Sequence, residues 1–198
     1  TSFMLVKNNG HYYTDATING NANTPIFVET GFHGMVVSVE WYNRILASLP
    51  LEEIKLQKEE HLHTDRTTRR IVKLFKGKVP VGDLTYEGRV FVVDTNEDYV
   101  TIPVNLLKNE ADSNVCLIRF DFKKNVLDYV RKDDVNLGKM HHYTLVENDP
   151  MPIFEATIEL SDALGHRLTK FGKFNFDLGN GSSVFFFRRS MLPALKEN

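Results

Sequence analysis

Phe27-Val28-Glu29-Thr30-Gly31 ends an apolar run with an acid, a hydroxyl residue and a glycine, and the apolar run Met35-Val36-Val37 follows. The same order returns near the other end of the chain, in Phe176-Asp177-Leu178-Gly179 and then Ser183-Val184-Phe185. Each copy is preceded by Ala-Thr-Ile, at residues 16–18 and 156–158. We interpret this as an internal repeat of strand, acidic loop and strand, and it decides the fold that we expect.

An acid at the end of an apolar strand and close to a glycine places a carboxylate at a tight turn, where the glycine admits a second loop. Two such loops face to face would bring two carboxylates together. Like charges at about 3 Å do not both ionise readily, so the pair would share one proton. One group can then activate a water as general base while the other protonates a carbonyl as general acid. The candidates for this pair are Glu29 and Asp177.

The two loops resemble the strand–Asp-Thr-Gly–strand signature of the pepsin and retropepsin aspartic proteases. The stretches Gly88–Asp94, Val100–Leu107 and Ile118–Val130 are similar in layout to the later part of a retropepsin lobe. The resemblance implies an all-β, acid-protease-like closed barrel, with one complete lobe over residues 1–135. Residues 136–198 would start a second lobe or belong to the same barrel.

The resemblance also implies a function, namely hydrolysis of peptide bonds in a peptide or unfolded protein substrate. Glu29 and Asp177 would be catalytic, and the loops would be shaped by Thr30, Gly31, Leu178 and Gly179. The sequence departs from the family pattern at two of these positions. Glu29 stands where the family has aspartate, which displaces the carboxylate by one methylene, and Leu178 replaces the hydroxyl residue that ties the two loops together.

Two alternatives remain at this point. The chain could be a catalytically inactive scaffold of the same fold that binds a peptide or a protein partner. It could be an unrelated β-barrel in which the two loops are ordinary turns that lie far apart. In either case the carboxylates would have local roles: Glu29 would cap N–H groups of its own turn, and Asp177 would form a turn with Gly179 and Asn180.

Alternating and apolar runs predict further β structure along the chain. Short strands are expected over 13–18, 25–28, 35–39, 71–75, 79–81, 89–94, 115–122, 126–130, 153–160, 168–176 and 183–187. A helix is expected from Ser38 to Pro50, a short one over 103–109 and a closing helical turn over 190–195. Residues 51–70 fit either a helix or a long exposed connection. Gly77, Gly82 and Gly88 are expected at turns.

Bulk properties exclude several classes of protein. The chain has 198 residues, 42% of them hydrophobic, and a net charge of −2 from 24 basic and 26 acidic residues. This composition supports a packed core and gives no electrostatic basis for a nucleic-acid partner. No apolar run is long enough for a membrane span. Because the sequence starts at Thr1 rather than at methionine, we expect a periplasmic or secreted protein, with a cytoplasmic one as the alternative.

Four other features of the sequence bear on function. His61 and His63 would share a face of a strand, but no acid or cysteine accompanies them, so solvated histidines are favoured, and neither a metal nor another cofactor is expected. His33 follows the first acidic loop and is a candidate modulator of Glu29. Cys116, flanked by apolar residues, is expected to be buried. Phe185-Phe186-Phe187 needs cover on both faces, by the first lobe or by a second chain, which makes a homodimer one of the expected partners.

Overall fold

The structure is a computed structural model that describes residues 1–63, 67–98, 100–146, 151–161 and 163–179. Strands dominate, and the predicted all-β fold class is confirmed. The central strands are β3 (His11–Ile18), β4 (Asn21–Glu29), β5 (Gly34–Ser38), β8 (Thr68–Val81), β9 (Leu84–Val93) and β10 (Val100–Pro103). Around them lie β2 (Val6–Asn8), β6 (Glu52–Ile54), β7 (Glu60–His63) and β11 (Leu107–Lys108).

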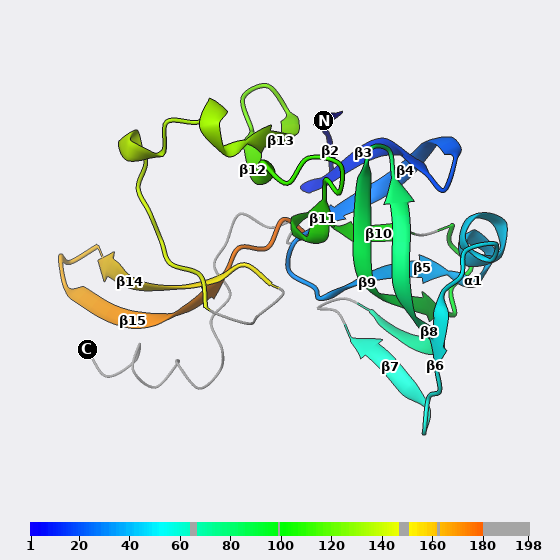
Figure 1. Cartoon of the computed structure of the whole chain (residues 1–198). Coiled ribbons are helices and arrows are strands. Elements are labelled where there is room, and N and C mark those ends of the chain that lie inside the picture. The colour runs from blue at the N-terminus through cyan, green and yellow to red at the C-terminus, as the bar shows by residue number, and fades with distance from the viewer. Residues whose placement is uncertain (64–66, 99, 147–150, 162, 180–198) are drawn as a thin grey trace.

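Pairing of the six central strands runs in a closed circuit. The order is β9, β5, β10, β4, β3 and β8, and β8 pairs again with β9. Strand β10 is inserted between β4, to which it is parallel, and β5, to which it is antiparallel. It therefore holds the two strands that flank the first acidic loop, and its Pro103 lies opposite Glu29. Figure 1 shows these strands gathered on one side of the molecule.

The core follows from alternation along the strands. In β4 every second residue from Thr24 to Val28 is buried, and in β3 the buried positions are Thr14, Ala16 and Ile18. Because side chains of a strand alternate between its two faces, this pattern directs one face of each strand into the barrel. Val28, just before Glu29, is fully buried, so the acidic loop starts from a fixed point.

The predicted helix after β5 begins where expected but is shorter. The Ser38 hydroxyl accepts a hydrogen bond from the Trp41 N–H at 3.1 Å, which caps the first turn. The segment consists of α1 (Val39–Trp41) and the π-helical turn η1 (Tyr42–Leu46), with Trp41, Ile45 and Leu46 buried. Val39, the first residue of α1, is exposed.

Three other sequence predictions are corrected. The helix considered for 51–70 is wrong, because β6 and β7 pair with β8. Gly77 and Gly88 lie opposite each other inside paired strands, and the turn of that hairpin is at Gly82, with φ +62°. Cys116 is exposed, because a register shift between Val115 and Leu117 interrupts the pairing of its strand there.

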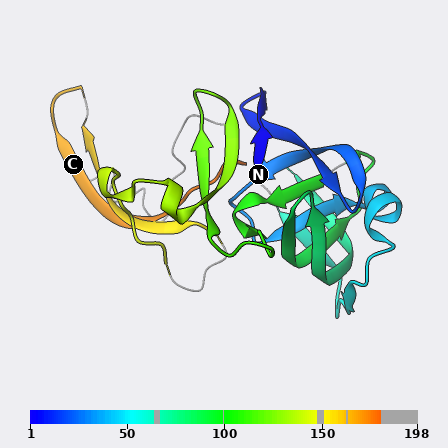
Figure 2. The ribbon, with the colours of Figure 1, turned by 45° about the horizontal axis from the view of Figure 1, so that its top comes forward.

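Outside the ring of six central strands lie the short helices η2 (Val104–Leu106), η3 (Lys132–Asp134) and η4 (Leu137–Lys139) and the strands β1 (Ser2–Met4), β12 (Val115–Asp121) and β13 (Val126–Arg131). These three strands form a sheet in the order β1-β13-β12. Strands β14 (Ile153–Ser161) and β15 (Arg167–Asn175) form a hairpin of their own, which stands away from the barrel (Figures 1 and 2). The strand predicted over 183–187, with its phenylalanines, and the turn over 190–195 lie outside the described residues.

Candidate active site

Glu29 is the last residue of β4, and its carboxylate turns back onto its own loop. Oε1 accepts hydrogen bonds from the backbone N–H groups of Thr30 at 2.8 Å and Gly31 at 2.5 Å. The local role considered from the sequence, capping of the turn, is therefore present. It uses one carboxylate oxygen and leaves Oε2 for other contacts.

Asp177 reaches the same place from the far end of the chain. Strand β15 ends at Asn175, and the Phe176 N–H donates to the Pro152 carbonyl at 3.0 Å, which directs the chain back to the barrel. Asp177 Oδ1 accepts the N–H of Gly179 at 2.8 Å. The second loop thus repeats the local geometry of the first, with an acid that caps the glycine two residues later.

The two loops face each other, and each carboxylate stands over the glycine of the opposite loop. A Cβ atom added to Gly31 would lie 2.6 Å from Asp177 Oδ1, and one added to Gly179 would lie 2.7 Å from Glu29 Oε1. Real Cβ contacts are not so short, so a side chain at either glycine would displace the carboxylate of the opposite loop. The Glu29 and Asp177 carboxyl groups are hydrogen-bonded to each other. The alternative that the loops lie far apart is wrong.

The Thr30 hydroxyl joins the two loops directly. It is fully buried, donates a hydrogen bond to the Phe176 carbonyl at 2.6 Å and accepts one from the Leu178 N–H at 2.9 Å. A hydroxyl can donate and accept at once, so one side chain satisfies two backbone groups of the partner loop. Leu178 has no hydroxyl with which to bind the first loop, but its side chain is buried in the barrel core. The second loop is therefore held in place by one polar contact, with the Thr30 hydroxyl, and one apolar contact, of Leu178 with the core.

The electrostatics of the pair favour a proton on Glu29. Burial, followed by the hydrogen bond to Asp177 and the charge of Asp177, raises the pKa of Glu29 from 4.5 to about 7. The N–H groups of Gly31 and Thr30 act in the opposite direction. Burial wins because a charged carboxylate loses hydration that two N–H groups only partly replace.

Aromatic rings flank both loops. The Phe176 ring packs against Phe120 of β12, with centroids 6.0 Å apart. His33 is exposed and lies against Phe32, with centroids 4.4 Å apart, and edge-on to Phe91. The structure gives no test of His33 as a modulator of Glu29, and that role stays a prediction.

Two contributions to the site had no signal in the sequence. One is the backbone carbonyl of Phe176, since any residue type supplies it. The other is Tyr86, a buried tyrosine of β9 whose hydroxyl accepts the Met35 N–H at 3.0 Å and donates to the Arg89 carbonyl at 2.5 Å. These bonds brace the start of β5 directly after the first loop. The strand pattern alone could only have indicated that Tyr86 is buried.

Within the described part of the chain, no group of three or more histidine, cysteine, aspartate or glutamate side chains could hold a metal ion. His61 and His63 are exposed neighbours on β7, with ring centroids 6.3 Å apart. Within the same residues, no helix combines the length and apolar character that crossing a bilayer requires.

Comparison with known proteins gives a limited result. No protein-family model matches the chain, and no curated protein matches it. Among solved structures, the chain is similar to a retropepsin-like aspartic protease from Rickettsia conorii, with 17% sequence identity and a TM-score of 0.37. The alignment covers 64% of this chain and 88% of that one. A likeness this loose concerns general fold only, and the function has to be inferred from the geometry of the loops.

Proposed function

We propose that this protein is an aspartic-type peptidase in which Glu29 and Asp177 form the catalytic pair. The observation that carries the proposal is the mutual hydrogen bond of the two carboxyl groups, each of which stands over the glycine of the opposite loop. Isolated turns would not need this arrangement. Asp177 is exposed, whereas burial and the hydrogen bond to Asp177 raise the pKa of the half-buried Glu29, and groups with such shifted pKa values concentrate at catalytic sites.

The pair divides into an acid and a base. With the shared proton on Glu29, Asp177 takes a proton from a water molecule while the water oxygen attacks the amide carbon of the substrate. Glu29 gives its proton to the carbonyl oxygen, which yields a neutral tetrahedral diol. The C–N bond then breaks as the nitrogen takes the proton from Asp177, and one diol hydroxyl returns its proton to Glu29. The products are a carboxylic acid and an amine, and both carboxyl groups regain their starting states.

Glutamate in place of aspartate is accommodated by the loop itself. A longer side chain loses more rotamer freedom when it is fixed, and catalytic groups must be held within about 0.5 Å. Here the N–H groups of Thr30 and Gly31 fix Oε1, which restrains the additional methylene. The reading supported best is therefore a working pair with an unusual acid rather than an inactivated site.

The test is cleavage of an unfolded protein between pH 4 and 8, with products identified by mass spectrometry. Glu29→Gln and Asp177→Asn keep the size of each side chain and should each abolish cleavage. Glu87→Gln and Asp15→Asn, at exposed positions on β9 and β3, are the matched controls and should cleave normally. Peptide binding without turnover in the unmodified protein would instead support the inactive scaffold. Cleavage that survives both active-site substitutions would refute the proposal.

A further inference from the structure

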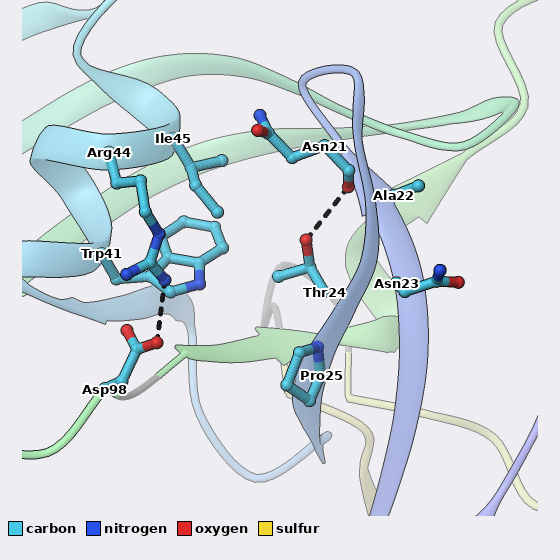
Figure 3. Close-up of a pocket in the computed structure, with 9 residues that line it drawn as sticks. All are labelled: Asn21, Ala22, Asn23, Thr24, Pro25, Trp41, Arg44, Ile45 and Asp98. Carbon is cyan, nitrogen blue, oxygen red and sulfur yellow. Dashed lines mark hydrogen bonds and ion pairs between the residues drawn. The ribbon is translucent and has the colours of Figure 1, made fainter.

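A second candidate site lies at the opposite end of β4 from Glu29. It is a pocket of about 250 Å³ between the start of β4, the α1–η1 turn and the loop before β10 (Figure 3). Its walls are formed by Asn21, Ala22, Asn23, Thr24, Pro25, Trp41, Arg44, Ile45 and Asp98. At roughly 30 Å³ per water molecule, the volume corresponds to about eight waters, which is room for one or two peptide residues.

Strand β10 lies between β4 and β5, and the pocket lies beside β4 beyond the start of β10. Strand β10 pairs with β4 only from Phe27 to Glu29. On that side of β4, the stretch from Asn21 to Ile26 has no strand partner among the described residues. An unpaired strand edge offers backbone donors and acceptors, and an extended peptide can bind there by adding a strand.

The wall opposite this edge is apolar in its depth and charged at its rim. The Trp41 and Ile45 side chains are buried and line the hollow, and Figure 3 shows them facing the start of β4. At the rim, Arg44 Nη2 lies 2.8 Å from Asp98 Oδ2, and both side chains are about half exposed, at 47% and 53%. A pair this exposed contributes little, so its arginine can exchange partners at low cost.

Hydrogen bonds hold both walls in place. Asn19, in the β3–β4 turn, donates from its side-chain amide to the Ile45 carbonyl at 2.6 Å and to the Ser48 hydroxyl at 3.1 Å. The Thr24 hydroxyl donates to the Asn21 carbonyl at 3.0 Å. The pocket is thus preformed, which lowers the entropy lost when a ligand binds.

We propose that this pocket binds the C-terminal end of a short extended peptide. The peptide backbone lies along the open edge of β4, an apolar last side chain packs on Trp41 and Ile45, and the terminal carboxylate binds Arg44. Arginine is the chosen partner because its planar fork matches a carboxylate. The site is separate from the Glu29–Asp177 pair and does not depend on peptidase activity.

The single tryptophan of the chain makes the test direct. Because Trp41 is the only tryptophan, its fluorescence and its indole N–H resonance report on this pocket without interference. The probe is N-acetylated Gly-Ala-Leu with a free terminal carboxylate, compared with the same peptide carrying a terminal amide. We expect saturable binding of the acid and about tenfold weaker binding of the amide, from loss of a charged hydrogen bond.

Variants separate the proposed contact from a general effect. Arg44→Met should weaken binding of the acid by about tenfold or more. Asp98→Asn should tighten binding, since it removes the closer of the two carboxylates, Asp98 and Glu40, that compete for Arg44. Arg70→Met is the matched control, because Arg70 forms a 2.8 Å pair with Asp94 at similar exposure and lies outside the pocket; it should bind normally, as should Asp177→Asn.

Several results would overturn the proposal. They are no saturable change in Trp41, equal binding of the acid and the amide, equal losses in Arg44→Met and Arg70→Met, or weaker binding in Asp98→Asn. Circular dichroism of each variant verifies folding, and Asp98→Asn provides a test by gain of affinity should Arg44→Met fail to fold. None of these results bears on cleavage by the Glu29–Asp177 pair, so the two proposals can fail separately.

Discussion

The carboxylate of Glu29 occupies the space in which a side chain on Gly179 would begin. Asp177 stands over Gly31 in the same way, so the two loops cross and each glycine serves the acid of the other loop. Neither glycine has a positive φ, so glycine is favoured at both positions by the lack of space for a side chain and not by the backbone conformation. This crossing ties the first loop of the barrel to a segment almost 150 residues later in the chain.

Gly179→Ala should therefore expel the Glu29 carboxylate from its position. Overpacking of this kind costs about 1–3 kcal/mol, and we expect that loss in urea unfolding together with loss of cleavage. Gly31→Ala should act alike through Asp177. Gly138→Ala is the control, since an added Cβ there would meet Asn136 Oδ1 at an ordinary 3.5 Å. A Gly179→Ala variant of unchanged stability would show that the loops do not cross as described.

Thr30→Val removes the hydroxyl that joins the loops and keeps the shape of the side chain. The Leu178 N–H and the Phe176 carbonyl lose a buried partner, which costs about 1–3 kcal/mol. Thr30→Ser retains the hydroxyl and should recover most of this loss. Hydrogen exchange of the Leu178 amide gives a local measurement, and we expect faster exchange in Thr30→Val only. Equal exchange in all three proteins would contradict the role of Thr30.

The raised pKa of Glu29 predicts how stability depends on pH. A carboxyl group whose pKa is higher in the folded state stabilises the fold below its unfolded value, and this contribution is lost as pH rises through the folded value. Between pH 4.5 and pH 7 the free energy of unfolding should fall by up to about 3 kcal/mol from this group. Urea titrations at several pH values should show a smaller fall in Glu29→Gln, which cannot ionise. An identical fall in both proteins would contradict the raised pKa.

Leu178→Ala tests the apolar anchor of the second loop. Its side chain is buried in the barrel core, and truncation of a buried leucine costs about 2–5 kcal/mol. Because Leu178 is next to Asp177, we also expect slower cleavage of the unfolded-protein substrate, at the same peptide bonds. Leu164→Ala, at a leucine 82% exposed, is the control and should leave the unfolding midpoint unchanged. If both substitutions changed the unfolding midpoint by the same small amount, Leu178 would not hold the second loop in place.

How far the sequence could be interpreted differs from element to element. Alternation predicted β3 and β5 to within two residues and the second halves of β4 and β9, because the period of a strand is visible where one face is buried. The charged stretch 51–70 was ambiguous, since β6 and β7 exist through pairing with β8 and their own sequences are polar. Cys116 was misjudged because a register shift, not its apolar neighbours, decides its exposure.

For the site, the sequence by itself determined the chemistry available: two acids, each two residues before a glycine, at the ends of strands. Only the tertiary structure decided that Glu29 and Asp177 meet, and that one threonine is sufficient to join the loops, through a carbonyl and an N–H that every residue carries. The physical reason is that a local pattern records which groups a turn presents. Which groups share a proton depends on contacts between distant segments, and these are set by the closure of the barrel and the return of residues 176–179.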